Sequence, residues 1–190
     1  MSIQVFANQY LNKLKEVLDG FDHACFEKIV MAILEAYEKE KYIFVMGNGG
    51  SAATASHFAC DLNKGCCLDL DRKFKMFCLN DNIPTLMALA NDVSYDVVFE
   101  EQLKNFFRPG DLAIAISGSG NSENVIRAIQ YAGLNGGRTI GLCGFSGGRL
   151  SELADIAFIV NSNDMQKIED VHVIVVHMIM QAVYKALHDR

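Results

Sequence analysis

Several features that mark disordered or secreted chains are scarce or missing in this sequence. Its 190 residues include only two prolines, and hydrophobic residues make up 51% against 21% charged residues. Together with the lack of any low-complexity tract, this balance argues against long disordered stretches, and no shift in composition divides the chain. We therefore expect a single domain over residues 1–190, in which about 1–40 forms a helical extension.

Segments that would direct the chain to a membrane are also missing. The N-terminus lacks the apolar stretch of a signal peptide, and no run of about eighteen uncharged apolar residues occurs. The segment that comes nearest to such a run is VHVIVVHMIMQAVY at 171–184. It contains two histidines, and its pattern predicts a buried helix. We expect no membrane partner.

The six cysteines contain no CxxC pair, so a cysteine metal cluster is not expected. In a chain without an export signal they indicate reduced thiols and a cytoplasmic location. They are Cys25, Cys60, Cys66, Cys67, Cys78 and Cys143. Basic residues are fewer than acidic ones, with 17 lysines and arginines against 23 aspartates and glutamates, so the net charge is -6. This argues against a general nucleic-acid surface and leaves any anion to be bound by a local pocket.

What is present is an alternation of helical and strand patterns. Two amphipathic helices open the chain, and five short apolar runs follow that are too continuous for half-exposed strands. The runs are 42–47, 74–80, 112–117, 139–144 and 156–161, with helical segments near 51–63, 84–91, 97–107, 122–135 and 147–154 and a last helix at about 166–188. This order predicts an α/β fold, a three-layer sandwich in which helices flank a five-stranded parallel sheet.

Two strand-to-helix turns have an unusual composition. GNGGS (47–51) and SGSGNS (117–122) each follow an expected strand, at the edge where open parallel sheets bind ligands. Glycines let the backbone approach a ligand, and the N–H groups at a helix start favour an anion. Tight connections alone could have the same composition, but two such turns favour a phosphate. No GxxxxGK[ST] or complete dinucleotide fingerprint occurs, so a small phosphorylated metabolite fits better than a nucleotide.

Five motifs extend this pattern along most of the chain. They are GNGGSAATASHFACDL (47–62), ALAND (88–92), ISGSGNSENVIRAI (116–129), GFSGGRL (144–150) and IEDVHVIVVH (168–177). In order and spacing they resemble the sugar isomerase (SIS) domain proteins of the phosphoheptose isomerase family. The resemblance implies a homotetramer in which the N-terminal helices pack, and conversion of sedoheptulose 7-phosphate to D-glycero-D-manno-heptose 7-phosphate.

The resemblance also implies roles for individual residues. The residues that would contact the substrate are Asn48, Gly49, Gly50, Ser51, Asn91, Asp92 and Glu169. The residues that would bind its phosphate are Ser117, Gly118, Ser119 and Ser122. A Zn²⁺ ion is implied at His57, Asp61, Glu169 and His177, with Asp61 and His177 as the catalytic pair.

The spacing of the titratable residues is compatible with these roles. Isomerisation needs a base that moves a proton between adjacent carbons and a group that neutralises the oxygen. His57 and Asp61 stand at i, i+4 and share one helix face. An exposed histidine beside a solvated aspartate would have the same spacing.

The last helix raises a separate question. It is apolar on almost every side, so it lies in the core or against other subunits, and an oligomer explains it best. Glu169, His172 and His177 are costly there unless they are paired, metal-bound or in a wet pocket, and structural pairing stays open. Glu169 and His177 lie about 12 Å apart along a straight helix, so both reach one ion only if the helix is distorted or a side chain reaches down.

Three positions depart from the family pattern. Asp61 stands where glutamate is usual, Glu169 where glutamine is usual, and Gly118 where threonine is usual. They leave two alternatives open: an isomerase of another sugar phosphate, or a non-catalytic SIS protein that binds a phosphosugar or a protein partner, as the replication-initiation regulators do. Retention of the histidine and acid set argues against the second alternative.

Overall fold

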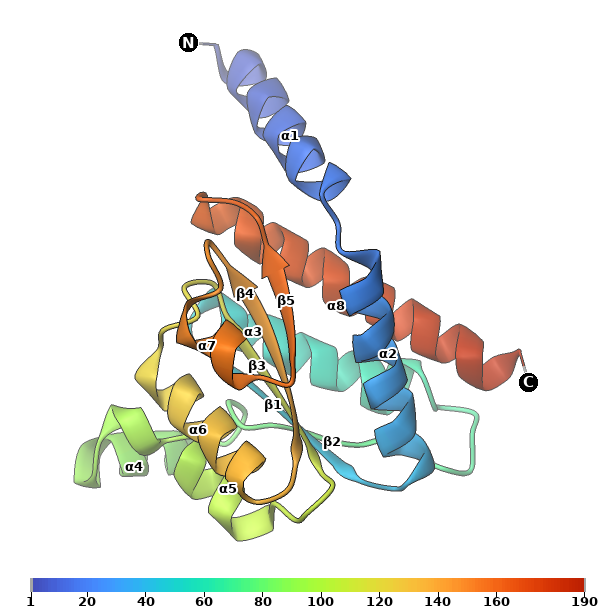
Figure 1. The fold of residues 1–190 in the computed structure, drawn as a ribbon, viewed down its shortest axis with the longest axis vertical. Coiled ribbons are helices and arrows are strands. Elements are labelled where there is room, and N and C mark those ends of the chain that lie inside the picture. The colour runs from blue at the N-terminus through green and yellow to red at the C-terminus, as the bar shows by residue number, and fades with distance from the viewer. Residues whose placement is uncertain (1, 190) are drawn as a thin grey trace.

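The computed structural model describes residues 2–189 and contains one parallel five-stranded sheet (Figure 1). The strands are β1 (Tyr42–Gly47), β2 (Lys75–Cys78), β3 (Leu112–Ser117), β4 (Arg138–Gly144) and β5 (Ile156–Val160), in the order β2-β1-β3-β4-β5. The central strand β3 is buried at every position, as expected for a parallel sheet that is covered on both faces. The predicted fold class is therefore confirmed.

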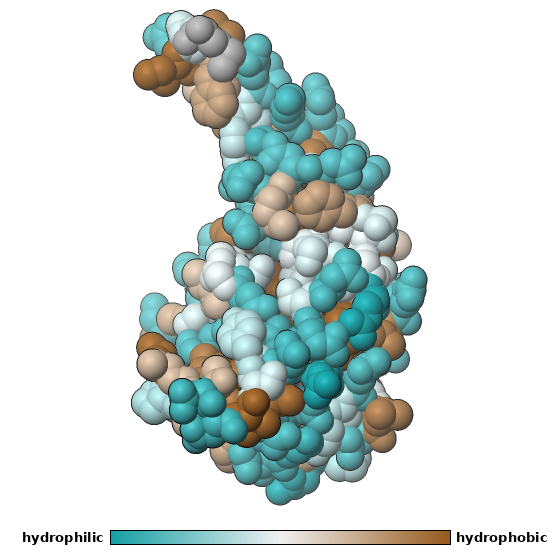
Figure 2. Space-filling model, turned by 90° about the vertical axis from the view of Figure 1, so that its left-hand side faces the viewer, coloured by the Kyte–Doolittle hydropathy of each residue, from teal (hydrophilic) through white to brown (hydrophobic). Residues whose placement is uncertain are grey.

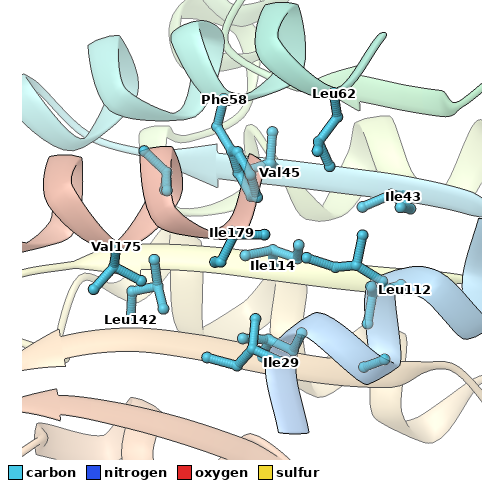
Figure 3. Packing of buried hydrophobic residues seen from close by; sticks show 14 of the residues in the cluster. Ile29, Ile43, Val45, Phe58, Leu62, Leu112, Ile114, Leu142, Val175 and Ile179 are labelled. Carbon is cyan, nitrogen blue, oxygen red and sulfur yellow. The ribbon is translucent and has the colours of Figure 1, made fainter. Parts of the chain in front are cut away.

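Helices cover both faces of the sheet. The described helices are α1 (Ile3–Asp19), α2 (His23–Glu38), α3 (Gly50–Cys60), α4 (Ile83–Asp92), α5 (Glu100–Phe106), α6 (Glu123–Leu134), α7 (Gly148–Leu153) and α8 (Met165–His188), with a π-helical turn η1 (Asp61–Gly65) and a 3₁₀ turn η2 (Tyr95–Val97). Helices α2, α3 and α8 pack in one hydrophobic cluster with the sheet, and α5, α6 and α7 contribute to the other. Side chains from α2, α3 and α8 meet strand residues in the first cluster, where Ile29, Phe58 and Val175 lie close to Ile114 and Leu142 (Figure 3).

Two expected helices differ from the structure. The helix expected over 51–63 ends as an α-helix at Cys60 and continues as η1, because the N–H of Cys66 donates to the carbonyl of Asp61 five residues back. The helix expected over 97–107 divides into η2 and α5. Neither change was visible in the hydrophobic period, because both turns lie at the ends of their helical segments, where assignments are least certain.

The first and last helices have opposite environments. Helix α8 is, among the described residues, the one helix whose length and hydropathy would allow it to cross a membrane; its buried face, with Val171, Val175 and Ile179, belongs to the core. Helix α1 has no buried residue and projects from the body, with hydrophobic side chains at its free end (Figures 1 and 2). Ile3 and Phe6 are more than half exposed there.

The strand order fixes where a ligand can bind. The chain leaves β1 toward β2 on one side and returns to β3 on the other, so β1 and β3 are neighbours at the point where the strand order reverses. Gly47 pairs with Ile116, which places the two glycine-serine turns next to each other.

Candidate active site

A pair of amide side chains joins the two glycine-serine turns. Asn48 Nδ2 donates to Asn124 Oδ1 at 2.9 Å, and Asn124 Nδ2 donates to Asn48 Oδ1 at 3.0 Å. The hydroxyl of Tyr95 donates to the same oxygen of Asn48 at 2.8 Å. Asn124 is only 2% exposed, so this reciprocal pair holds the loop after β1 rigidly against the start of α6.

The second turn is arranged to receive an anion. Ser117 Oγ and Ser122 Oγ lie 3.4 Å apart, and the hydroxyl of Ser122, which is the N-cap of α6, caps no backbone N–H of that helix. The start of a helix of 12 residues thus faces the turn, where hydroxyls and N–H groups favour negative charge. At Gly118 an added Cβ would lie 2.5 Å from the sulfur of Met165, so the methionine fills the space that a larger residue would need.

The first turn has a different electrostatic environment. Helix α3 begins after Gly49, which has a positive φ of 55° and provides no side-chain cap. The carboxylate of Glu169 lies directly against this helix start, since a Cβ on Gly50 would be 2.9 Å from Glu169 Oε1. Ser51 is buried in the first turn of the helix. The Glu169 carboxylate already complements the dipole of α3. The first turn of α6 also contains a carboxylate, Glu123, but two arginines, Arg127 and Arg149, bind it, so the start of α6 is less unfavourable for an anion.

Two histidines and an aspartate converge at the other end of α3. The Nε2 atoms of His57 and His177 are 3.0 Å apart, and His57 Nε2 lies 3.2 Å from Asp61 Oδ2. His57 and Asp61 are one turn apart at the end of α3, whereas His177 comes from α8. The turn η1 that follows Asp61 is joined to α8, because the buried Cys66 thiol donates to the carbonyl of Met180 at 3.3 Å.

The donor set of this group suits a divalent cation. One ligand atom from each of His57, Asp61 and His177 lies within 4.8 Å of the others. Two neutral imidazoles facing each other can form one hydrogen bond, and Asp61 Oδ2 is buried without a hydrogen-bond partner in residues 2–189. Donor atoms around a tetrahedral zinc ion are separated by roughly 3.3 Å, close to the two short distances here. The residues therefore fit a metal with three protein ligands and an open position.

A cavity of about 370 Å³ extends from His57 and His177 toward the start of α3, and Asp61 lies beside these histidines rather than in its lining. Its walls come from α3 and α8, and its lining is Gly50, Ala53, Thr54, His57, Glu169, Asp170, Val173, Val176 and His177. Glu169 shares the cavity with the histidines but is not part of the close group, because α8 is a continuous helix between Glu169 and His177. Its role as a metal ligand stays a prediction.

Asn91 and Asp92 lie apart from this cavity. Both are exposed at the end of α4, where Asn91 Nδ2 donates to Asp92 Oδ1 at 2.8 Å. Three residues that the sequence did not single out are close to the site: Asn124, Tyr95 and Asp170. Asn124 could have been found from the sequence, because it follows Ser122 by two residues at the expected start of a helix. Nothing in the sequence pointed to Tyr95 or Asp170.

His172 has a structural environment. It is 1% exposed, and its Nε2–H donates to the carbonyl of Cys143 in β4 at 3.1 Å. Its Nδ1 is buried without a partner in the described residues. Burial lowers the pKa of His172 to about 4, although the bond to Cys143 acts in the opposite direction. His172 is therefore neutral near pH 7 and ties α8 to the sheet.

Comparison with known protein families assigns the chain to the class of SIS domains. The family profile described as SIS domain matches residues 9–144. The chain is 41% identical over 157 residues to the phosphoheptose isomerase of Aliarcobacter butzleri, covering 83% of this chain and 82% of the relative. It is 36% identical over 171 residues to that of Helicobacter pylori, covering 90% and 88%.

Solved structures agree with these sequence relatives. The phosphoheptose isomerase GmhA from Neisseria gonorrhoeae superposes with a TM-score of 0.89 at 25% identity, covering 96% of this chain and 98% of that one. The chain thus belongs to the phosphoheptose isomerase family, which confirms the resemblance in the sequence.

Proposed function

We propose that this chain is an aldose–ketose isomerase that converts sedoheptulose 7-phosphate to D-glycero-D-manno-heptose 7-phosphate through an enediol. The relatives named phosphoheptose isomerase support this activity. The observation that carries the proposal is the 3.0 Å approach of His57 and His177 beside Asp61, at a cavity whose lining reaches Gly50 of the first turn.

In this proposal the phosphate binds at the start of α6. Ser117, Gly118, Ser119 and Ser122 supply hydroxyl and backbone donors, and the helix dipole stabilises the charge. Asn48, Gly49, Gly50 and Ser51 contact the sugar chain from the first turn. Support comes from the Glu169 carboxylate, which leaves the start of α3 unfavourable for a second anion.

The proton transfer is assigned to Asp61 and His177. One of them removes a proton from the carbon next to the carbonyl, and the other exchanges protons with the oxygens as the enediol forms and collapses. Asp61 suits the role of base because its Oδ2 has no hydrogen-bond partner in residues 2–189. His57 Nε2 lies 3.2 Å from the same oxygen without a hydrogen bond to it.

A Zn²⁺ ion is proposed at His57, Asp61 and His177, with Glu169 as a further candidate ligand. When bound, the ion supplies Lewis-acid stabilisation of the charge that develops on the sugar oxygens. The orphaned Asp61 oxygen and the spacing of the three donor atoms support this assignment.

We further propose a cytoplasmic homotetramer of single-domain subunits. The projecting α1, with Ile3 and Phe6 exposed, supports packing of the N-terminal helices in an oligomer, because such apolar surface is rare on monomers. Asn91 and Asp92, which are exposed at the end of α4, would approach a substrate through movement of α4 or from a neighbouring subunit.

The test is an assay of the purified protein with sedoheptulose 7-phosphate, in which the aldose product is measured with zinc added and after treatment with a chelator. We expect turnover with zinc and loss of at least about 10²-fold after chelation, with recovery when zinc is restored. No aldose under any metal condition would refute the proposal.

The departures Asp61 and Gly118 favour one alternative, an isomerase of another sugar phosphate. The shorter acid retracts the base, and a misplacement of about 1 Å can cost about 10²-fold in rate. The missing hydroxyl at position 118 removes one donor to the phosphate. A panel of pentose, hexose and heptose phosphates distinguishes the two, because a better kcat/KM for a non-heptose would favour the alternative.

A further inference from the structure

Tyr10 connects the projecting helix α1 to the wall of the sugar cavity. Its hydroxyl donates to Asp170 Oδ2 at 2.7 Å, the one side-chain hydrogen bond between α1 and α8 within residues 2–189. Asp170 lines the cavity together with Glu169, His57 and His177. A residue 160 positions away in the chain thus contacts the cavity wall directly.

The ring of Tyr10 is also fixed on its face. Lys167 Nζ lies 3.2 Å from the ring centroid, and the same ammonium lies 3.0 Å from Asp164 Oδ2. The Lys167 side chain is only 6% exposed, so this cation–π contact is shielded from water. With an ammonium on its face and a carboxylate at its hydroxyl, Tyr10 has one favoured orientation, and the bond to Asp170 raises the pKa of its phenol to about 12.

The carboxylate of Asp170 retains capacity to bind a ligand. An ionised carboxylate accepts about four hydrogen bonds, and Tyr10 provides the one that reaches Asp170 in the described part of the chain. Hydroxyl groups of an open-chain sugar are donors of the kind it can accept. Asp170 also lies beside Glu169, and two adjacent carboxylates in a cavity disfavour a phosphate while they suit a polyol.

We propose that Asp170 recognises hydroxyl groups of the sugar chain and that Tyr10 is the positioning residue that holds its carboxylate toward the cavity. The inference rests on the proposed function for the class of ligand. It makes α1 part of substrate recognition, since any displacement of α1 removes the donor from Asp170. A purely structural role for Tyr10 would fasten α1 to α8 without affecting the sugar.

The test is a double-mutant cycle with Tyr10→Phe, Asp170→Ala and the combined variant. Tyr10→Phe keeps the ring over Lys167 and removes only the hydroxyl, so we expect KM for sedoheptulose 7-phosphate to rise about 3- to 10-fold, with kcat within about twofold. Asp170→Ala should raise KM further, and the combined variant should match Asp170→Ala, because Tyr10 acts through Asp170. The matched control is Tyr184→Phe, an exposed tyrosine near the other end of α8.

Unchanged KM in Tyr10→Phe, or effects of the two substitutions that multiply, would overturn the inference. Hydrogen exchange of the α1 amides in Tyr10→Phe identifies a purely structural role of Tyr10. In that case the exchange of these amides is faster than in the wild type, and KM is unchanged. Calorimetric titration with the same sugar phosphate separates this inference from the proposed function. A wild-type protein that binds without turnover contradicts the isomerase, and the weaker binding expected of Tyr10→Phe still tests the role of Tyr10. A wild-type protein that does not bind the sugar overturns both.

Discussion

The Nε2 atoms of His57 and His177 lie 3.0 Å apart although 120 residues separate them in the chain. His57 comes from the end of α3 and His177 from the middle of α8, and these two helices pack side by side on one face of the sheet. Two imidazoles at this distance, with a buried aspartate oxygen beside them, form a place where a cation or a substrate proton is favoured.

Replacement of His177 tests this cluster directly. We expect His177→Ala to lower kcat by at least about 10²-fold, because it removes both a proton-transfer group and a metal ligand. Bound zinc, measured by atomic emission, should fall as well. His188→Ala is the control, since His188 is the last residue of α8, eleven positions beyond His177. Activity within about threefold of the wild type would exclude His177 from the reaction.

The amide pair between Asn48 and Asn124 predicts a binding defect. Asn124→Ala removes a buried partner and leaves the Asn48 amide with Tyr95 alone. We expect a loss of about 1–3 kcal/mol in the free energy of unfolding, measured with urea, and a rise in KM because the two turns are no longer held together. Asn105→Ala, on the exposed side of α5, is the matched substitution. If KM and stability both stayed at wild-type values, the pair would have no role in joining the turns.

Met165 limits which residue the second glycine-serine turn accepts at position 118. A Cβ at position 118 would lie 2.5 Å from the Met165 sulfur, so we expect Gly118→Thr alone to weaken phosphate binding and to destabilise the fold by about 1–3 kcal/mol. Combination with Met165→Ala should recover much of both losses and add a hydroxyl donor. Calorimetry with the sugar phosphate and urea unfolding provide the measurements. Equal defects with and without the second substitution would show that Met165 is not the obstacle.

Stability should depend on pH through His172. Its pKa is about 4 in the folded protein and about 6.5 when unfolded, so the unfolded chain binds more protons between these values. The contribution of His172 is therefore fully present above about pH 6.5 and is lost as the pH falls toward 4, by about 3 kcal/mol in total. Urea unfolding at several pH values measures this slope.

His172→Gln removes the titrating group, so its unfolding free energy should vary less between pH 4 and 6.5 than that of the wild type. An identical slope in His172→Gln and the wild type would contradict the shifted pKa.

The fold was largely predictable because its signals are local. β1 and β3 were predicted with the bounds that the structure has, since each is a continuous apolar run with a glycine-serine turn at its end. The spacing of His57 and Asp61 likewise placed both on one helix face. The π-turn at 61–65 was not predictable, because it lies at the end of the helix and too few helical residues follow it to reveal the shift in the hydrophobic pattern.

The sequence by itself thus determined the layers of the sandwich, the two turns at the strand ends and the helix face that His57 and Asp61 share, because each depends on neighbours a few positions away. Only the tertiary structure decided that His177 meets His57, that Glu169 lies against the start of α3, and that Tyr10 reaches Asp170. Those contacts depend on how α1, α3 and α8 pack against one another, and the packing of distant helices is fixed by the shape of the whole core rather than by any local pattern.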